Sequence, residues 1–216
     1  MSLVIKLVRH AESEANVGRM TAHESGDHAI PLSPRGVEQA RSVGRRIGRE
    51  FLADALVYTS PYRRTKDTLR EIFVGVGLEP PGGPAGRYED PRLREVEHGY
   101  EPPEPQEELR AKHGWFYYRF RGGESPADCY DRTSSFLESL MRQVERKQAE
   151  RVLIVTHGLT LRCFVMRFLH LSVEEFDALA NPGNCDVVTL AAKEELASPV
   201  FTSGRWGVDG LRLRET

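Results

Sequence analysis

LVRHAESEAN, residues 7–16, places an arginine and a histidine where an apolar run gives way to small polar residues. The run before this pair is apolar apart from Lys6, which is typical of a buried β-strand over about residues 3–9. Such a strand delivers Arg9 and His10 to its carboxyl end. Because open α/β sheets bind ligands at that edge, the stretch predicts both a sheet and the side of it that carries function.

Further strand-to-helix units follow along the chain. PLSPRGVEQA (31–40) predicts a helix that begins with a Ser-Pro pair and ends near Phe51. ALVYTS (55–60) predicts a second buried strand, and a second helix with the same Ser-Pro start follows it. RVLIVTHG (151–158), the most apolar strand candidate, again leads into a helix. This alternation predicts a parallel sheet with helices on its faces.

The pattern changes in the middle of the chain and near its end. Proline and glycine between about residues 79 and 123 predict no long regular element there, and long loops in compact domains are usually lids or binding loops. A helix begins again at Ser125, with a start resembling a capping box. An amphipathic segment (172–180), a strand near 185–191 and an edge strand within 198–207 complete the predicted order.

The expected fold is therefore α/β, a three-layer αβα sandwich with a mostly parallel central sheet flanked by helices. We expect one domain over residues 1–216 with a lid inserted at about 79–122.

Composition limits the possible partners. The 30 basic and 32 acidic residues give a formal net charge of −2, so no overall field draws the protein to nucleic acid or to an anionic membrane. No apolar run approaches the roughly 20 residues of a membrane span, and the first apolar stretch is too short for a signal peptide. We expect a cytoplasmic protein. Cys129, Cys163 and Cys185 lack the spacing of a disulfide framework or a zinc site.

Three predicted strand ends carry distinctive polar residues. They are Arg9 with His10, Ser60 leading to Arg63 and Arg64, and Thr156 with His157. Because the carboxyl ends of parallel strands lie along one edge, these groups can converge. Two guanidinium groups and two imidazoles around one point form an anion site, and the arginine fork suits phosphate oxygens. Gly158 opens a helix whose amide groups would point to the same place.

These motifs resemble the histidine phosphatase superfamily, the phosphoglycerate mutase-like proteins. LVRHAESEAN is similar to the family's Arg-His-Gly-Glu signature and its following asparagine, with Ala11 in place of the glycine. PLSPRGVEQA, TSPYRRTKDT, RLREVEHGY, GGESPADCYDR and VTHGLTLR are similar to further family segments. Only the expected lid lacks a close match to the mutases.

The resemblance implies that His10 is the nucleophile, becoming phosphorylated, and that Glu95 protonates the departing oxygen. It further implies a set of residues that hold the phosphoryl oxygens: Arg9, Arg64, His157 and Asn16. Arg64 is preferred to Arg63 because it lies four residues after Ser60, where the family arginine falls. This scheme requires no metal or other cofactor, and its substrate is a small phosphorylated metabolite.

Elementary electrostatics is consistent with these roles. A histidine attacks only when neutral, and nearby guanidinium groups oppose the protonation of His10. The negative charge of a substrate beside a partly desolvated Glu95 raises the pKa of that carboxyl, which favours the protonated acid.

Other functions stay open with less support. A metal-dependent hydrolase with His10, His157, His98 and Glu95 as ligands is disfavoured by the adjacent arginines. RNA binding through KHGWFYYRFR (112–121) competes with a simpler interpretation, in which the aromatic residues pack within the lid. A non-catalytic, phospho-ligand-binding member is a further alternative.

Within the enzyme interpretation, a phosphatase competes with a phosphoglycerate mutase. REVEHG (94–99) lacks the asparagine and tyrosine typical of mutases and has Val96 in place of their arginine, which favours the phosphatase. Basic residues of the lid are available to a second anionic group of a substrate. Its identity and the oligomeric state are not readable from the sequence.

Overall fold

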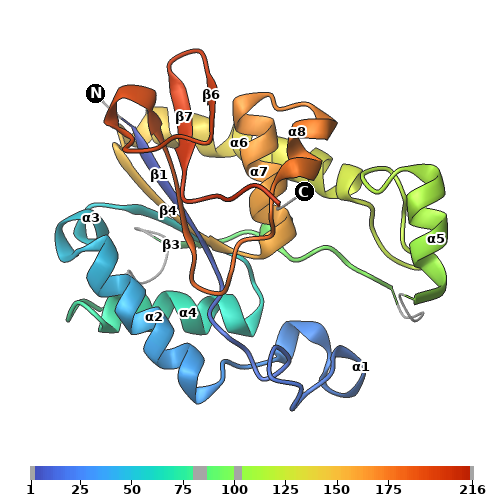
Figure 1. Ribbon diagram of the computed structural model, residues 1–216. Helices are drawn as coiled ribbons and strands as arrows, with labels where there is room; N and C mark the ends of the chain where they lie inside the picture. The colour runs from blue at the N-terminus through green and yellow to red at the C-terminus, as the bar shows by residue number, and fades with distance from the viewer. Residues whose placement is uncertain (1–2, 80–86, 100–103, 215–216) are drawn as a thin grey trace.

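The computed structural model describes residues 3–79, 87–99 and 104–214. Its described strands form one seven-stranded sheet in the order β3-β2-β4-β1-β5-β7-β6 (Figure 1). The strands are β1 (Val4–Arg9), β2 (Leu56–Thr59), β3 (Arg87–Glu89), β4 (Arg151–Thr156), β5 (Val187–Ala192), β6 (Phe201–Ser203) and β7 (Trp206–Asp209). Strands β1 to β4 pair in parallel, whereas β5 runs antiparallel to β1. The sheet is thus mixed and mostly parallel, as predicted.

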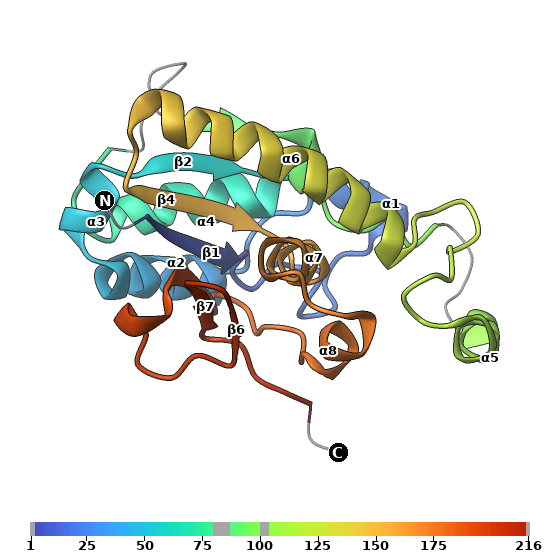
Figure 2. The same cartoon turned by 90° about the horizontal axis from the view of Figure 1, so that it is seen from above.

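Helices cover both faces of the sheet (Figures 1 and 2). One face carries α2 (Pro34–Ile47), α3 (Arg49–Ala53) and α4 (Arg63–Val74), and the other carries α6 (Pro126–Lys147), α7 (Gly158–Leu169) and α8 (Val173–Ala178). Alternate residues of a strand point to opposite faces. Leu7 accordingly packs in the core beneath α6 and α7, and Val8 packs in the core beneath α2 and α4. This arrangement confirms the three-layer αβα sandwich.

Helix starts follow the sequence signals in two of three cases. The Ser33 hydroxyl accepts from the Gly36 amide at 3.0 Å, and Ser125 forms a reciprocal capping box with Asp128. The Ser-Pro pair at Ser60 was expected to start a helix in the same way, but α4 begins at Arg63 without a side-chain cap. The reason is that the Ser60 hydroxyl instead bonds His157.

The first predicted helix is shorter than expected. It was predicted to continue to Phe51, but α2 ends at Ile47 and the short helix α3 follows. Gly48 separates them with φ of 90°, a backbone conformation that glycine adopts without strain. The chain therefore turns at Gly48 before entering β2.

The segment predicted to lack regular structure contains two elements. The edge strand β3 pairs with β2, and α5 (Glu104–His113) is a ten-residue helix. The expectation of no long element was therefore wrong, because the helix-favouring run around EELRAK outweighs the nearby prolines. Figure 2 shows α5 standing away from the sheet. Residues 80–86 and 100–103 of the expected lid lie outside the described residues.

Other parts of the central segment join the core. Phe116 and Phe120 are buried, and Trp115 and Tyr118 pack partly against the core next to α6 and α7. These aromatic residues were expected to pack within the lid, and they contact the main core instead.

The C-terminal part of the chain contains one strand more than expected. It forms the hairpin β6–β7, where the sequence predicted a single edge strand.

The described helices include none that combines the length and apolar character needed to cross a membrane. The three cysteines are buried and unpaired.

Candidate active site

Two histidines meet at the carboxyl ends of neighbouring strands. Arg9 of β1 pairs in register with Thr156 of β4, so the residues that follow each strand, His10 and His157, become neighbours. Their ring centroids lie 5.3 Å apart, although the two residues are far apart in the sequence. The predicted convergence of the two strand ends is therefore present in the structure.

The hydrogen bonding of His10 defines its tautomer. Its Nδ1 lies 2.8 Å from the Ala11 carbonyl oxygen, which only accepts, so Nδ1 carries the proton and donates. The lone pair consequently sits on Nε2. Burial lowers the pKa of His10 to about 3, with contributions from the charges of Arg64 and Arg9. His10 is thus a neutral imidazole with one basic nitrogen, which is the form a nucleophile needs.

His157 is held from one side only. Its Nε2 lies 2.8 Å from the Ser60 hydroxyl. Its Nδ1 is buried and has no hydrogen-bond partner, and it lies 4.0 Å from Oε2 of Glu95. Burial, followed by the charge of Arg64, lowers the pKa of His157 well below its ordinary value. The unpartnered nitrogen is free to bind a ligand oxygen next to His10.

Two arginines supply positive charge to the site. Arg9 donates from Nη1 to the Pro182 carbonyl at 2.7 Å, and its Nε is buried without a partner. Arg64 is 5 % exposed and binds Asp27. Arg63 points elsewhere: its side chain is 59 % exposed and pairs with Asp67 on the surface of α4. The structure therefore brings Arg64, and not Arg63, to the histidines.

The environment of Glu95 raises the pKa of its carboxyl on balance. Burial raises the pKa of its carboxyl, while the Val96 amide, which donates to Oε1 at 3.0 Å, and the charge of Arg64 act in the opposite direction. The other carboxyl oxygen, Oε2, lies 4.0 Å from Nδ1 of His157. Glu95 is therefore placed to give a proton to a group bound between it and the two histidines.

Hydroxyl and guanidinium groups fix the loop that carries Glu95. Thr156 donates to the Leu93 carbonyl at 2.8 Å, and Thr160 donates to the Arg94 carbonyl at 2.7 Å. Arg132 donates to the Arg92 carbonyl at 2.6 Å. These bonds tie the loop to β4, α7 and α6, so Glu95 is positioned by three elements of the body.

Asn16 is exposed next to the segment that follows His10, whereas Gly158 is buried at the start of α7. The side-chain oxygen Oδ1 of Asn16 accepts from the Ser13 amide at 3.0 Å and from Nδ2 of Asn184 at 3.2 Å. The side-chain NH2 group of Asn16 is therefore the part that can donate to a ligand. Asn184 also donates to the His10 carbonyl at 3.0 Å. Gly158 opens α7 as predicted, and a side chain there would overlap Asn181, because a Cβ would lie 2.4 Å from its Oδ1.

Three residues of the site were not identified from the sequence. They are Asp27, which binds Arg64; Asn184, which links His10 to Asn16; and Glu124, which binds Arg94 and Arg132. Glu124 lies in a segment with a family resemblance, so that resemblance was its available signal. Asp27 and Asn184 lie in irregular polar stretches that carry no such pattern.

The residues considered as metal ligands do not form one group. The ring of His98 packs edge-to-face against Phe120 with centroids 4.7 Å apart. In the part of the chain that the structure describes, no three or more His, Cys, Asp or Glu side chains are grouped so that they could hold a metal ion.

Comparisons with known proteins show which family and which fold the chain is similar to. The model of the histidine phosphatase superfamily (branch 1) matches residues 5–201. A phosphoglycerate mutase-like protein from Arabidopsis thaliana is 36 % identical, over 94 % of this chain and 81 % of its own length. A broad-range acid phosphatase from Saccharomyces cerevisiae is 27 % identical, over 89 % of this chain and 86 % of its own. The structure of a mycobacterial glucosyl-3-phosphoglycerate phosphatase superposes with a TM-score of 0.73 at 23 % identity, over 97 % of this chain and 98 % of that one.

Proposed function

The chain belongs to the histidine phosphatase superfamily, branch 1, and from that premise we propose that it hydrolyses phosphate monoesters through a phosphohistidine at His10. The observation that carries the proposal is the pairing of a neutral His10, with its lone pair on Nε2, with His157 at 5.3 Å between ring centroids. Splitting the reaction at a covalent intermediate replaces one difficult step by two easier ones.

The first step forms a nitrogen–phosphorus bond. Nε2 of His10 attacks phosphorus, the bond to the ester oxygen breaks, and Glu95 gives that oxygen its proton, so the alcohol leaves neutral. Arg9, Arg64, His157 and the amide of Asn16 bind the remaining phosphoryl oxygens. These fixed charges and donors stabilise the charge of the transition state without having to reorganise.

The second step releases the phosphate. Glu95, now ionised, takes a proton from a water molecule, whose oxygen attacks phosphorus as the bond to Nε2 breaks. Inorganic phosphate leaves, and both His10 and Glu95 return to their starting protonation states. The same carboxyl therefore acts first as acid and then as base.

The position of Val96 supports a phosphatase over a mutase. Val96 stands where the resemblance places an arginine in mutases, and it is buried in the core beneath α6 and α7. It offers no charge to a second phosphate group. A relative called a broad-range acid phosphatase, from Saccharomyces cerevisiae, lends further support.

The substrate class is a small phosphorylated metabolite. Several arginines that were considered for a second anionic group are engaged with carboxylates, which weakens that idea: Arg94 binds Glu124, Arg110 binds Glu107 and Arg119 binds Asp128. The proposal also takes residues 1–216 as one cytoplasmic catalytic domain with a lid inserted at about 79–122.

The test is release of inorganic phosphate from a chromogenic phosphate monoester. We expect turnover by the wild type, an acid-labile phosphate label on His10, and loss of both in His10→Ala. His170→Ala, which removes an exposed histidine at the end of α7, should leave both unchanged. Interconversion of phosphoglycerates without phosphate release would indicate the mutase. Phosphate binding without turnover would indicate a non-catalytic protein.

A further inference from the structure

Arg64, one of the two arginines whose charges act on the histidines, is already bound to a carboxylate of the same chain. Asp27 accepts from Arg64 at both carboxylate oxygens, from Nη1 at 2.8 Å and from Nη2 at 3.1 Å, and its carbonyl accepts from Nη1 at 2.7 Å. A guanidinium has five N–H donors, so Asp27 takes three of them. The paired bonds have the fork geometry with which arginine binds phosphate.

Resting on the function proposed above, we propose that Asp27 is an internal competitor of the substrate: its carboxylate holds Arg64 until the phosphoryl group displaces it. Arg64 cannot turn to a new partner freely, because it is 5 % exposed and its guanidinium lies 4.9 Å from the ring centroid of Tyr62. A phosphoryl group that takes the same paired bonds from Nη1 and Nη2 of Arg64 therefore has to replace the carboxylate of Asp27.

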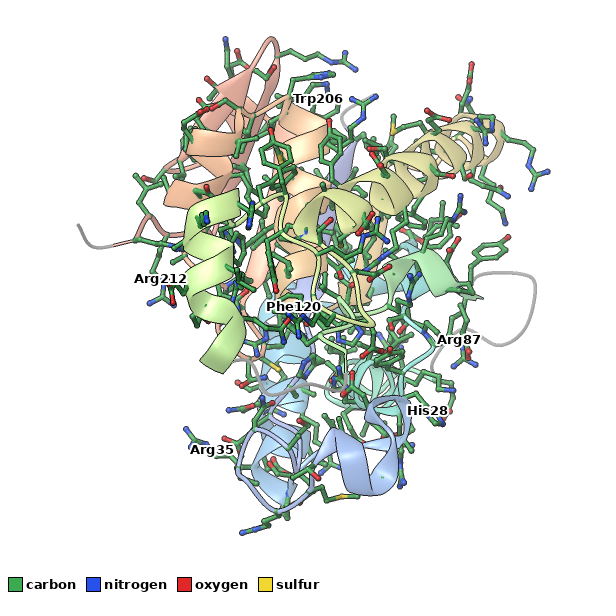
Figure 3. All side chains as sticks on the ribbon, turned by 90° about the vertical axis from the view of Figure 1, so that its right-hand side faces the viewer. His28, Arg35, Arg87, Phe120, Trp206 and Arg212 are labelled. Carbon is green, nitrogen blue, oxygen red and sulfur yellow. The ribbon has the colours of Figure 1, made fainter. Side chains whose placement is uncertain are left out.

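The segment that carries Asp27 has few contacts that would oppose its movement. Asp27 begins the three-residue 3-10 helix η1 (Asp27–Ala29), which has no side-chain cap and no buried residue. Few buried contacts mean that such a segment moves at small cost. Figure 3 shows His28, the next residue, on the surface below Phe120, on the side of the molecule from which α5 also projects.

Space for the displaced carboxylate lies beside it. A cavity of about 210 Å³ is lined by Asp27 together with Gly26, His28, Tyr62 and Glu97. Asp27 is already 35 % exposed at its side chain, so release into this cavity leaves the carboxylate hydrated. The displaced state therefore carries no buried unpaired charge.

If Asp27 competes with the substrate, its removal should strengthen substrate binding, whereas if Asp27 only positions Arg64, its removal should weaken it. If Asp27 competes, Asp27→Asn removes the ionic part of the contact, and both the KM for a phosphate monoester and the inhibition constant of inorganic phosphate should fall about five-fold. This factor corresponds to the ~1 kcal/mol upper range of a partly exposed ion pair. The kcat should change less than two-fold, because the ion pair is absent from both the substrate complex and the transition state.

Asp67→Asn is the matched control. It removes one carboxylate from α4, where Asp67 pairs with Arg63 and Arg70 away from the histidines, so it changes the net charge equally. We expect KM and phosphate inhibition to stay within two-fold of the wild type. Asp27→Ala is the second variant, which should behave like Asp27→Asn, whereas Asp27→Glu should restore competition in part.

The outcomes separate the two proposals. A rise in KM and weaker phosphate inhibition in Asp27→Asn and Asp27→Ala, with wild-type turnover intact, would overturn the competitor and make Asp27 a positioning residue of Arg64. An unchanged KM and inhibition constant would also overturn it. Absence of turnover and of phosphate binding in the wild type would instead overturn the function proposed above.

Discussion

Glu124 offers a direct test of how the acid-bearing loop is held. Its Oε1 accepts from Arg94 and from Nε of Arg132 at 3.1 Å, and its Oε2 accepts from Nη2 of Arg132 at 3.1 Å and from the Glu97 amide at 3.3 Å. Glu124→Gln keeps the shape of the side chain and removes its charge. The guanidinium groups of Arg94 and Arg132 then lose their anionic partner.

The size of the effect follows from burial. The side chains of Arg132 and Glu124 are 10 % and 14 % exposed, so the pair lies near the buried limit. Removing one partner of a buried pair costs about 3–5 kcal/mol. Glutamine retains one accepting oxygen and some solvent reaches the site, so we expect about 2 kcal/mol of lost stability. For a chain of this size that corresponds to a fall in Tm of about 4–8 °C.

Thermal unfolding measures this loss, and kcat with an alkyl phosphate ester measures the misplacement of Glu95. Glu107→Gln is the control, because its exposed pair with Arg110 should contribute less than about 1 kcal/mol. We expect the Glu124 variant to lose both stability and kcat, and the Glu107 variant to keep both. Equal Tm values for the two variants would refute the idea that Glu124 fixes the loop.

Two further predictions concern the acid and the packing of the fold. Glu95→Gln should reduce kcat/KM for alkyl esters by about 10²–10⁴ but affect a p-nitrophenyl ester far less, because that leaving group needs no proton. Equal losses of kcat/KM for both esters in Glu95→Gln would contradict this role. Glu95 acts as an acid only when it is protonated, and its pKa is raised, so wild-type turnover of an alkyl ester should decline as the pH rises through that pKa. Gly44→Ala should destabilise by about 1–3 kcal/mol in chemical denaturation, since a Cβ there would lie 2.0 Å from the Ile72 carbonyl oxygen of α4. A rise in stability, as alanine usually gives in place of glycine in a helix, would contradict this prediction and show that the two helices can separate.

Periodicity and strand ends were enough to predict the layers of the fold. Buried runs such as residues 151–156 are recognisable because both faces of the strand are covered. The central segment was harder to predict, because a proline or a glycine disfavours helix and strand only at the positions next to it. The helix α5 forms between such signals, and β3 is a three-residue strand whose pairing with β2 depends on tertiary contact.

Site residues were likewise predictable only where a local sequence pattern lies next to them. His10 and His157 stand beside apolar strands, so their strand-end positions indicated a common edge. The partners of Arg64 and Arg94 could not be found by such reasoning. Asp27 reaches Arg64 across 37 positions, and Glu124 reaches Arg94 across 30, from segments without periodicity. Contacts of this kind are fixed by the folded backbone and leave no local pattern.

The surrounding cations lower the pKa of both proposed reacting groups, which favours a neutral His10 but opposes a protonated Glu95. Burial and the charges of Arg64 and Arg9 all lower the pKa of His10, which favours the neutral imidazole that the proposed nucleophile needs. For Glu95, burial raises the pKa, while the same two cations lower it. An anion on Arg64 therefore helps to keep Glu95 protonated. With Asp27 as competitor, substrate binding exchanges one anion for another on Arg64. The carboxylate of Asp27 and the phosphoryl group therefore act on the pKa of Glu95 in the same direction, because each offsets the charge of Arg64, which lowers that pKa.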